Sequence, residues 1–178
     1  MSDKRILRAR LRAIRDAFVA GRPSPVLPPA SFLDALTPGV IVASYHPIGS
    51  EADPARFDQA VRASGAMLVL PVVIDRATSI HFAAAESKLV DGPFGLRQPA
   101  TDAPHLVPDI IVTPLLGFDA ALNRLGQGAG HYDRAFAQWP HAMRIGVAWS
   151  VQQVDALAPD PWDMPLHAIV TERGVVGS

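Results

Sequence analysis

Short apolar runs constrain the fold of this chain more than any other feature. Each run has the length of a β-strand and is apolar throughout, whereas a strand with one face in water would alternate apolar and polar residues. Strands of this kind are buried on both sides in parallel sheets covered by helices. We therefore expect a three-layer α/β fold, in which a mostly parallel, Rossmann-like open sheet is flanked by helices. The predicted strands are Val40–Ser44, Met67–Ile74, Ile80–Ala83, Asp109–Leu115, Arg144–Trp149 and His167–Thr171.

Segments with helical spacing lie between the predicted strands. Ala55–Ser64 follows the start signal Asp53-Pro54 and is ended by Gly65, and His131–Ala137 and Ser31–Leu36 are further candidates. Strands that alternate with helices predict right-handed crossover connections. The sequence shows no internal repeat and no second domain boundary, so we expect a single domain over residues 1–178.

The N-terminal segment differs in composition from the rest of the chain. An apolar stripe with helical spacing predicts an amphipathic helix over about residues 3–20, and it is formed by Leu7, Leu11, Ile14 and Phe18. A basic stripe lies beside it, formed by Lys4, Arg8, Arg12 and Arg15. Residues 21–30, with four prolines, predict a stiff connector after this helix.

Composition excludes several classes of function. With 0 cysteines the chain has no disulfide, no thiolate metal site and no cysteine nucleophile. The formal net charge of −1 gives no reason to expect nucleic acid as a partner. The chain shows neither a signal peptide nor an apolar run long enough to cross a membrane. We therefore expect a cytoplasmic protein, and a monomer is the default expectation for its oligomeric state.

A glycine-rich segment after the strand Asp109–Leu115 carries the clearest chemical signal. Gly126, Gly128 and Gly130 alternate there, and positions without side chains allow successive backbone N–H groups to face one anion. The predicted helix from His131 would direct its N-terminus at the same anion. Two arginines flank the segment, Arg124 and Arg134. The pattern predicts a phosphate site, and its alternative is a glycine turn needed only for tight packing.

This segment matches neither of the common nucleotide-binding loops. No lysine followed by serine or threonine comes after the last glycine, as a Walker A loop requires. The third glycine falls one position too early for the dinucleotide-binding pattern. Asp133 follows the glycines, and a carboxylate beside a phosphate site often holds Mg²⁺. The alternatives for Asp133 are an acid in the first turn of a helix or the partner of an arginine.

The flanks of this segment resemble the 5-formyltetrahydrofolate cyclo-ligase family, also called the methenyltetrahydrofolate synthetases. The stretches that carry the resemblance are Pro114-Leu115-Leu116-Gly117-Phe118-Asp119 and Arg124-Leu125-Gly126-Gln127-Gly128-Ala129-Gly130-His131-Tyr132-Asp133-Arg134. Shorter matches extend over nearly the whole chain: Lys4-Arg5-Ile6-Leu7-Arg8, Ser44-Tyr45, Glu51-Ala52-Asp53, Gly95-Leu96-Arg97-Gln98-Pro99, Ile145-Gly146-Val147-Ala148 and Ile169-Val170-Thr171-Glu172.

The resemblance implies an enzyme that uses ATP and Mg²⁺ to convert 5-formyltetrahydrofolate to 5,10-methenyltetrahydrofolate, with release of ADP and phosphate. The formyl oxygen would be phosphorylated, and N10 would then close the ring. The residues implied to bind ATP are Lys4, Arg5, Arg8, Arg124, Leu125, Gly126, Gln127, Gly128, Ala129, Gly130, His131 and Tyr132. Those implied to act in catalysis are Arg124, Gln127 and His131. Those implied to bind the folate are Tyr45, His46, Glu51 and His131, and those implied to bind the metal are Asp133 and Asp163.

Several of these residues have simpler explanations. The basic stripe is equally typical of a solvated helix face, Glu51 of an acid before a helix, and Asp163 of an ordinary turn. Asp119 either caps the glycine segment or binds a metal, and the sequence does not separate the two.

Two positions depart from the family pattern. His131 stands where the family usually has tyrosine, and Leu122 stands at a usual glycine position. These departures favour the main alternative, a folate- or nucleotide-binding module of the same fold without catalytic activity.

Overall fold

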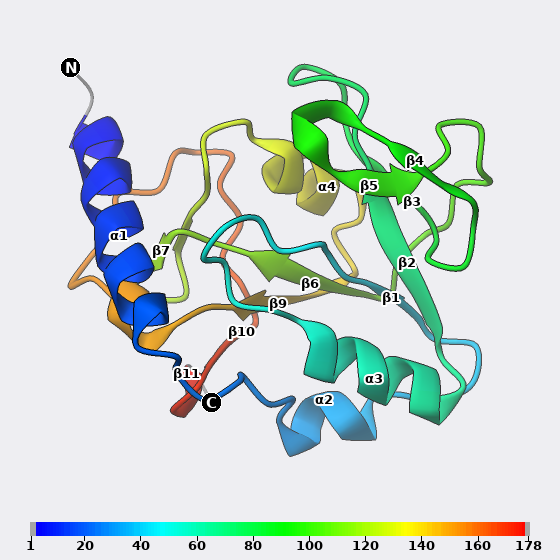
Figure 1. Cartoon of the computed structure of the whole chain (residues 1–178), viewed down its shortest axis with the longest axis horizontal. Helices are drawn as coiled ribbons and strands as arrows, with labels where there is room; N and C mark the ends of the chain where they lie inside the picture. Colours follow the sequence, from blue (N-terminus) through cyan, green and yellow to red (C-terminus); the bar gives the residue numbers. More distant parts are fainter. Residues whose placement is uncertain (1–2, 177–178) are drawn as a thin grey trace.

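The computed structural model describes residues 3–176, so the ends of the predicted domain, residues 1–2 and 177–178, lie outside the described residues. A seven-stranded sheet runs through the middle of the molecule (Figure 1). Its strands, in spatial order, are β11 (Gly174–Val176), β10 (Ala168–Thr171), β9 (Met143–Val147), β6 (Ile110–Pro114), β1 (Ile41–Ala43), β2 (Met67–Val72) and β3 (His81–Ala84).

Parallel pairing joins the five central strands. β10, β9, β6, β1 and β2 pair in parallel, whereas β3 and β11 pair antiparallel at the two edges. The prediction of a mostly parallel sheet flanked by helices is thus confirmed, with all six predicted strands present to within about two residues at each end. The edge strand β11 was not predicted.

Two small hairpins lie outside the main sheet. β4 (Leu89–Asp91) pairs with β5 (Arg97–Pro99), and β7 (Gly117–Phe118) pairs with β8 (Arg124–Leu125). A 3₁₀ turn, η1 (Pro93–Gly95), lies between β4 and β5. Strands of two or three residues carry too little periodicity to be recognised in a sequence.

Helices cover both faces of the sheet. α2 (Ala30–Asp34) and α3 (Ala55–Ser64) lie on one face, and α4 (His131–Gln138) lies on the other (Figure 1). Phe32 and Phe57 of these helices are buried in the core on the first face, and Ala135 and Phe136 of α4 are buried in the core on the second. α3 ends at Gly65, whose positive φ of 78° is the left-handed conformation that glycine adopts without strain.

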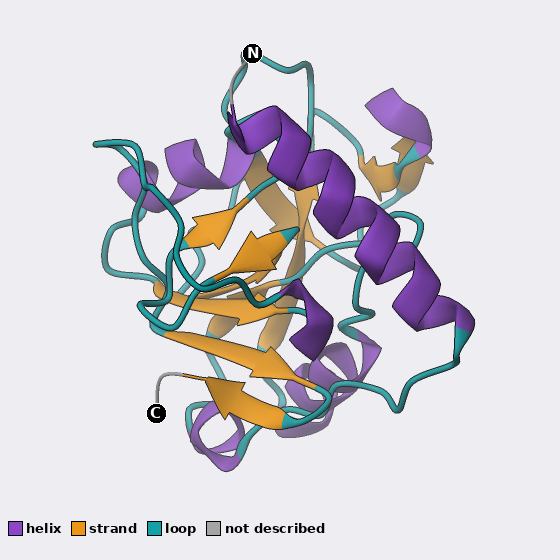
Figure 2. Cartoon of the chain, turned by 90° about the vertical axis from the view of Figure 1, so that its left-hand side faces the viewer, coloured by secondary structure: helices purple, strands orange, loops and turns teal. Residues whose placement is uncertain are grey.

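The N-terminal helix α1 (Asp3–Ala20) lies apart from these layers and crosses in front of the strands in Figure 2. Its Leu11 is buried against Leu116 and Leu125, next to the β7–β8 hairpin. α1 also contacts the 3₁₀ turn η2 (Ser150–Gln152), which follows β9. The helix therefore lies beside the carboxyl ends of the central strands. No helix in the described part of the chain combines the length and the apolarity that a bilayer crossing requires.

Candidate active site

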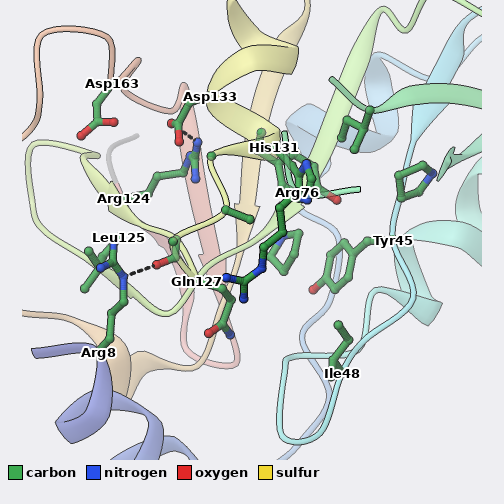
Figure 3. A pocket seen from close by; sticks show the side chains of 18 of the residues that line it. Arg8, Tyr45, Ile48, Arg76, Arg124, Leu125, Gln127, His131, Asp133 and Asp163 are labelled. Carbon is green, nitrogen blue, oxygen red and sulfur yellow. Dashed lines mark hydrogen bonds and ion pairs between the residues drawn. The ribbon is translucent and has the colours of Figure 1, made fainter. Parts of the chain in front are cut away.

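A cavity of about 410 Å³ lies at the carboxyl ends of the parallel strands. Chain segments that follow β1, β2 and β6 line it, together with α1 and residues 157–163. In open α/β sheets, ligands bind in this position because the loops that follow neighbouring strands meet there. Figure 3 shows side chains from these separate segments directed toward one space.

The glycine segment forms one wall of the cavity. Gly128 and Gly130 have φ values of 104° and 69°, and α4 begins directly after Gly130. Among residues 3–176, the backbone N–H groups of residues 127–133 donate no hydrogen bond to another part of the protein. A Cβ atom at Gly128 would meet only the Arg8 side chain, at 3.6 Å. The glycine is therefore needed for its backbone conformation and not for close packing, and the exposed N–H groups remain able to bind an anion.

Arg124 is the buried cation of this wall. Its guanidinium forms an ion pair with Asp133 and lies 4.9 Å from the ring centre of Phe136. Burial lowers the pKa of Arg124, and the charge of Asp133 opposes this effect. The Nε atom is buried without a hydrogen-bond partner in the described structure. Arg124 is thus fixed in place with part of its hydrogen-bonding capacity unused.

The basic stripe of α1 borders the same cavity. Arg8 lines it and donates from Nε to the carbonyl oxygen of Gly126 at 2.9 Å (Figure 3). Lys4 also lines it, with Nζ 2.7 Å from Asp160 and 3.7 Å from Asp163. The alternative explanation of the basic stripe, a helix face that only contacts solvent, therefore does not hold for Lys4 and Arg8. Arg5, predicted with them, is exposed and is not among the lining residues.

Carboxylates lie close to these cations. Asp133, in the first turn of α4, and Asp163, in the turn over residues 160–163, both line the cavity. The described residues contain no group of three or more histidines, aspartates or glutamates placed to hold a metal. Mg²⁺ at phosphate sites needs only one or two carboxylates, so this pair remains suitable.

Asp119 lies outside the cavity and acts as a cap. Its carboxylate accepts backbone N–H groups of Ala121, Asn123 and Leu157 and the side-chain amide of Asn123, at 2.9–3.0 Å. Burial raises the pKa of Asp119, but these hydrogen bonds outweigh it and hold the pKa below its usual value. The structure therefore favours a capping role over the metal role that the sequence left open. The segment that Asp119 caps is the turn over residues 119–123, which precedes the glycine segment.

The segment after β1 forms the opposite side of the cavity. Tyr45 is buried and donates its hydroxyl to the carbonyl of Ala52. Glu51 accepts the N–H of Ile48 at 2.9 Å through Oε2 and the amide of Gln127 at 3.3 Å through Oε1. Burial raises the pKa of Glu51, although these hydrogen bonds partly oppose it. His46 also lines the cavity. Glu51 precedes α3 by four residues and so is not an acid of its first turn.

His131 opens α4 between the two sides. Its Nδ1 lies 3.1 Å from Nη2 of Arg134. The Arg134 guanidinium also donates through Nη1 to the carbonyl of Ala129 and through Nη2 to the carbonyl of Arg76. Burial and then the charge of Arg134 lower the pKa of His131. The imidazole is therefore neutral near pH 7.

Several lining residues were not predicted. Arg76 follows β2 and extends into the cavity near Gln127 (Figure 3). Gln98 is buried and pairs with the backbone of Val73 through two hydrogen bonds of 3.0 Å. Position after a parallel strand was the available signal for Arg76. Gln98 belongs to one of the shorter stretches that match the family, but that match predicted no site role for it. Trp162 also lines the cavity and was not among the predicted site residues.

Comparisons with known proteins agree with the fold and identify the family. The model of the 5-formyltetrahydrofolate cyclo-ligase family matches residues 1–172. A 5-formyltetrahydrofolate cyclo-ligase from Mycolicibacterium smegmatis is 32% identical over 78% of this chain and 77% of its own length. The Escherichia coli K12 protein of the same name is 37% identical over 51% of this chain. This match spans about half of that relative, 53% of its length.

Two solved structures share the fold. A 5,10-methenyltetrahydrofolate synthetase from Mycoplasma pneumoniae superposes with a TM-score of 0.67 at 26% identity, covering 96% of this chain and 99% of that one. The Aquifex aeolicus 5,10-methenyltetrahydrofolate synthetase gives a TM-score of 0.64 at 28% identity, covering 98% and 84%. With a family model matched from residue 1 to residue 172, the chain belongs to the 5-formyltetrahydrofolate cyclo-ligase family.

Proposed function

We propose that this protein is an ATP- and Mg²⁺-dependent enzyme that converts 5-formyltetrahydrofolate to 5,10-methenyltetrahydrofolate, ADP and phosphate. The observation that supports this most is that one cavity is lined on one side by the glycine segment with its cations and on the other by Tyr45 and Glu51. A reaction between a nucleotide and a second substrate needs both ligands in contact within one site.

The chemistry requires positioning and charge neutralisation more than a protein nucleophile. The formyl oxygen attacks the γ-phosphorus and ADP leaves, which gives an iminium phosphate at N5. N10 then attacks the formyl carbon, loses its proton and expels phosphate together with the former formyl oxygen. Phosphoryl transfer of this kind is accelerated by fixed N–H donors and cations around the transferred group.

In this proposal the nucleotide lies along the glycine segment. The N–H groups of residues 127–133 donate hydrogen bonds to its terminal phosphates, and the guanidinium of Arg124 neutralises their charge. Lys4 and Arg8 approach the same phosphates from α1. The same role is proposed for the rest of the segment, Leu125 to Tyr132. Arg5 is the weakest of the proposed ATP contacts because its side chain is exposed outside the cavity wall.

Mg²⁺ fits the carboxylates at this end of the cavity. Asp133 and Asp163 offer hard oxygen ligands within reach of a nucleotide phosphate, and these are the ligands that Mg²⁺ prefers. When bound, the ion would neutralise charge on the phosphate oxygens. Asp133 would then share its carboxylate between the metal and Arg124.

The folate is proposed to lie against the segment after β1. The ionised carboxylate of Glu51 can pair with the donors of the pterin amino-pyrimidine edge, and Tyr45, His46 and His131 line the space beside it. Apolar residues such as Val73 and Ile80 cover the same end of the cavity. A flat, partly apolar ligand is suited to such a surface.

Turnover tests the proposal directly. We expect the near-ultraviolet absorbance of the methenyl product to grow when 5-formyltetrahydrofolate, ATP and Mg²⁺ are all present, and not when ATP is omitted. Arg124→Gln should lower kcat/KM about 100-fold, since it removes a charge beside the transferred phosphate. Binding of both ligands without product would contradict the proposal and favour the binding module.

A further inference from the structure

Gln127 connects the two sides of the cavity. Its backbone belongs to the glycine segment, while its side-chain Nε2 donates to Glu51 across the cavity wall at 3.3 Å. Its Oε1 accepts a hydrogen bond from Arg12 of α1 at 2.9 Å. The side chain of Gln127 thus contacts both helix α1 and the carboxylate that is proposed to hold the pterin. Figure 3 shows Gln127 between Arg8 and Tyr45.

Glu51 is also supported from the other direction. Arg15 of α1 is buried and donates from Nε to the hydroxyl of Ser50 at 2.9 Å. Ser50 in turn donates to Asp16, and its carbonyl accepts the indole N–H of Trp149 at 3.0 Å. These contacts fix the backbone next to Glu51. The positive charge of Arg15 acts on Glu51 from the same side and favours its ionised form.

The two supports differ in how firmly they are held. Arg15 and Trp149 are buried, so their contacts with Ser50 form part of the packed interior. Gln127 is exposed and its segment has N–H groups with no partner in the described structure, so the position of its side chain depends on that segment. A phosphate bound to those N–H groups would restrict the segment and with it the carboxamide of Gln127.

We propose that Gln127 is a positioning residue that couples the two substrates: nucleotide binding at the glycine segment holds Glu51 in the orientation that binds the pterin, and folate binding tightens the nucleotide in return. This inference rests on the proposed function, because it assigns the two ligands to the two sides of the cavity. The two effects are equal, since coupling between two binding equilibria is reciprocal.

The coupling is measured by titration without turnover. 5-Formyltetrahydrofolate is titrated into the protein with and without a non-hydrolysable ATP analogue and Mg²⁺, and the analogue is titrated with and without the folate. For the native chain we expect each ligand to lower the Kd of the other by the same factor, about tenfold. In Gln127→Met, which keeps an unbranched side chain of similar length, the factor should fall below about twofold.

One further variant isolates the contact of Gln127 with Glu51, and a second serves as a control. Gln127→Glu keeps an acceptor for Arg12 but places a second carboxylate beside Glu51, so its coupling should be lost as in the methionine variant. Arg62→Gln is the matched control, because Arg62 is an exposed residue of α3 that pairs with Glu86. Its coupling should equal that of the native chain.

Each outcome has a distinct meaning. An unchanged coupling factor in Gln127→Met would overturn the inference. Normal turnover by a native chain whose ligands bind independently would also overturn it, while leaving the proposed function intact. Failure of the native chain to turn over, with neither ligand bound, would remove the proposed function and the coupling together.

Discussion

A buried carboxylate, that of Asp119, is stable in this molecule because hydrogen bonds compensate for its loss of solvent. Asp119 is buried with four N–H donors around its carboxylate, and its turn includes Leu122, a non-glycine residue with a positive φ of 64°. Leu122 stands where the family usually has glycine, and the backbone there has the conformation that glycine favours. The hydrogen bonds of Asp119 to Ala121 and Asn123 hold the turn in which Leu122 adopts this conformation.

Asp119→Ala should therefore be strongly destabilising. The substitution removes the acceptor of the partly buried N–H groups of Ala121, Asn123 and Leu157, so we expect the free energy of unfolding to fall by about 2–4 kcal/mol. Urea denaturation measures this loss, with the exposed Asp102→Ala as control. The folded pKa of Asp119 is lowered, so its stabilisation is present above the unfolded pKa of about 3.9 and disappears as the pH falls through the folded value. An equal loss at acid pH would contradict this account.

Glu51→Gln should raise the stability of the fold while weakening the binding of folate. The folded pKa of Glu51 is raised, so stability decreases as the pH rises from the unfolded pKa of about 4.3 through the folded value. Near neutral pH the neutral variant avoids that cost, and we expect its Tm to rise by about 2–4 °C while folate affinity falls more than about tenfold. Calorimetry at about pH 7.5 and pH 4 should show the gain only at the higher pH. A lower Tm at about pH 7.5 would contradict this account, because it would show that the ionised carboxylate stabilises the fold.

His131→Tyr tests whether the imidazole has chemistry of its own. Because the pKa of His131 is lowered, the ring is neutral near pH 7 and can be replaced by another flat ring. We expect kcat/KM to stay within about threefold of the native value between about pH 7 and pH 8. A large loss in a folded protein would assign the imidazole a specific task, and His131→Ala shows the effect of removing the ring.

At the scale of elements, the sequence predicted those whose hydrophobic pattern is long. The helix over residues 3–20 and the strand near Ile110 were predicted closely because their apolar residues repeat over several positions. The hairpin of β7 and β8 was not, because each strand has only two residues and so carries no readable hydrophobic periodicity. The glycine segment was recognisable since its residues are contiguous, whereas Gln98 enters the cavity wall only through tertiary pairing with Val73.

α1 shows why an element's position matters for function. Leu11 anchors it, and Lys4 and Arg8 lie on the same helix and border the cavity. Leu11→Ala should lower the free energy of unfolding by about 2–4 kcal/mol and weaken nucleotide binding, because the helix loses its buried contact. Ile6→Ala on the same helix is the control, since Ile6 is 58% exposed. Calorimetric titration with an ATP analogue compares them, and equal affinities in the two variants would show that docking of α1 does not position its cations.

For the whole molecule, the parallel sheet brings the loops after β1, β2 and β6 to one edge, and α1 completes the wall. Lys4 and Asp160, which are separated by 156 positions in the sequence, meet there. This convergence follows from topology: parallel strands present their carboxyl ends on the same side, whatever their distance along the chain. Our central claim is that the N–H groups of residues 127–133, which have no partner within residues 3–176, hold the terminal phosphates of ATP while Glu51 holds the pterin.

A crystal structure of the ternary complex with a non-hydrolysable ATP analogue, Mg²⁺ and 5-formyltetrahydrofolate tests that claim most directly. The account predicts β- and γ-phosphate oxygens about 2.7–3.2 Å from N–H groups of residues 127–133, and the pterin edge on the carboxylate of Glu51. Phosphates bound elsewhere, or N–H groups of this segment bonded to protein carbonyls in the complex, would contradict it.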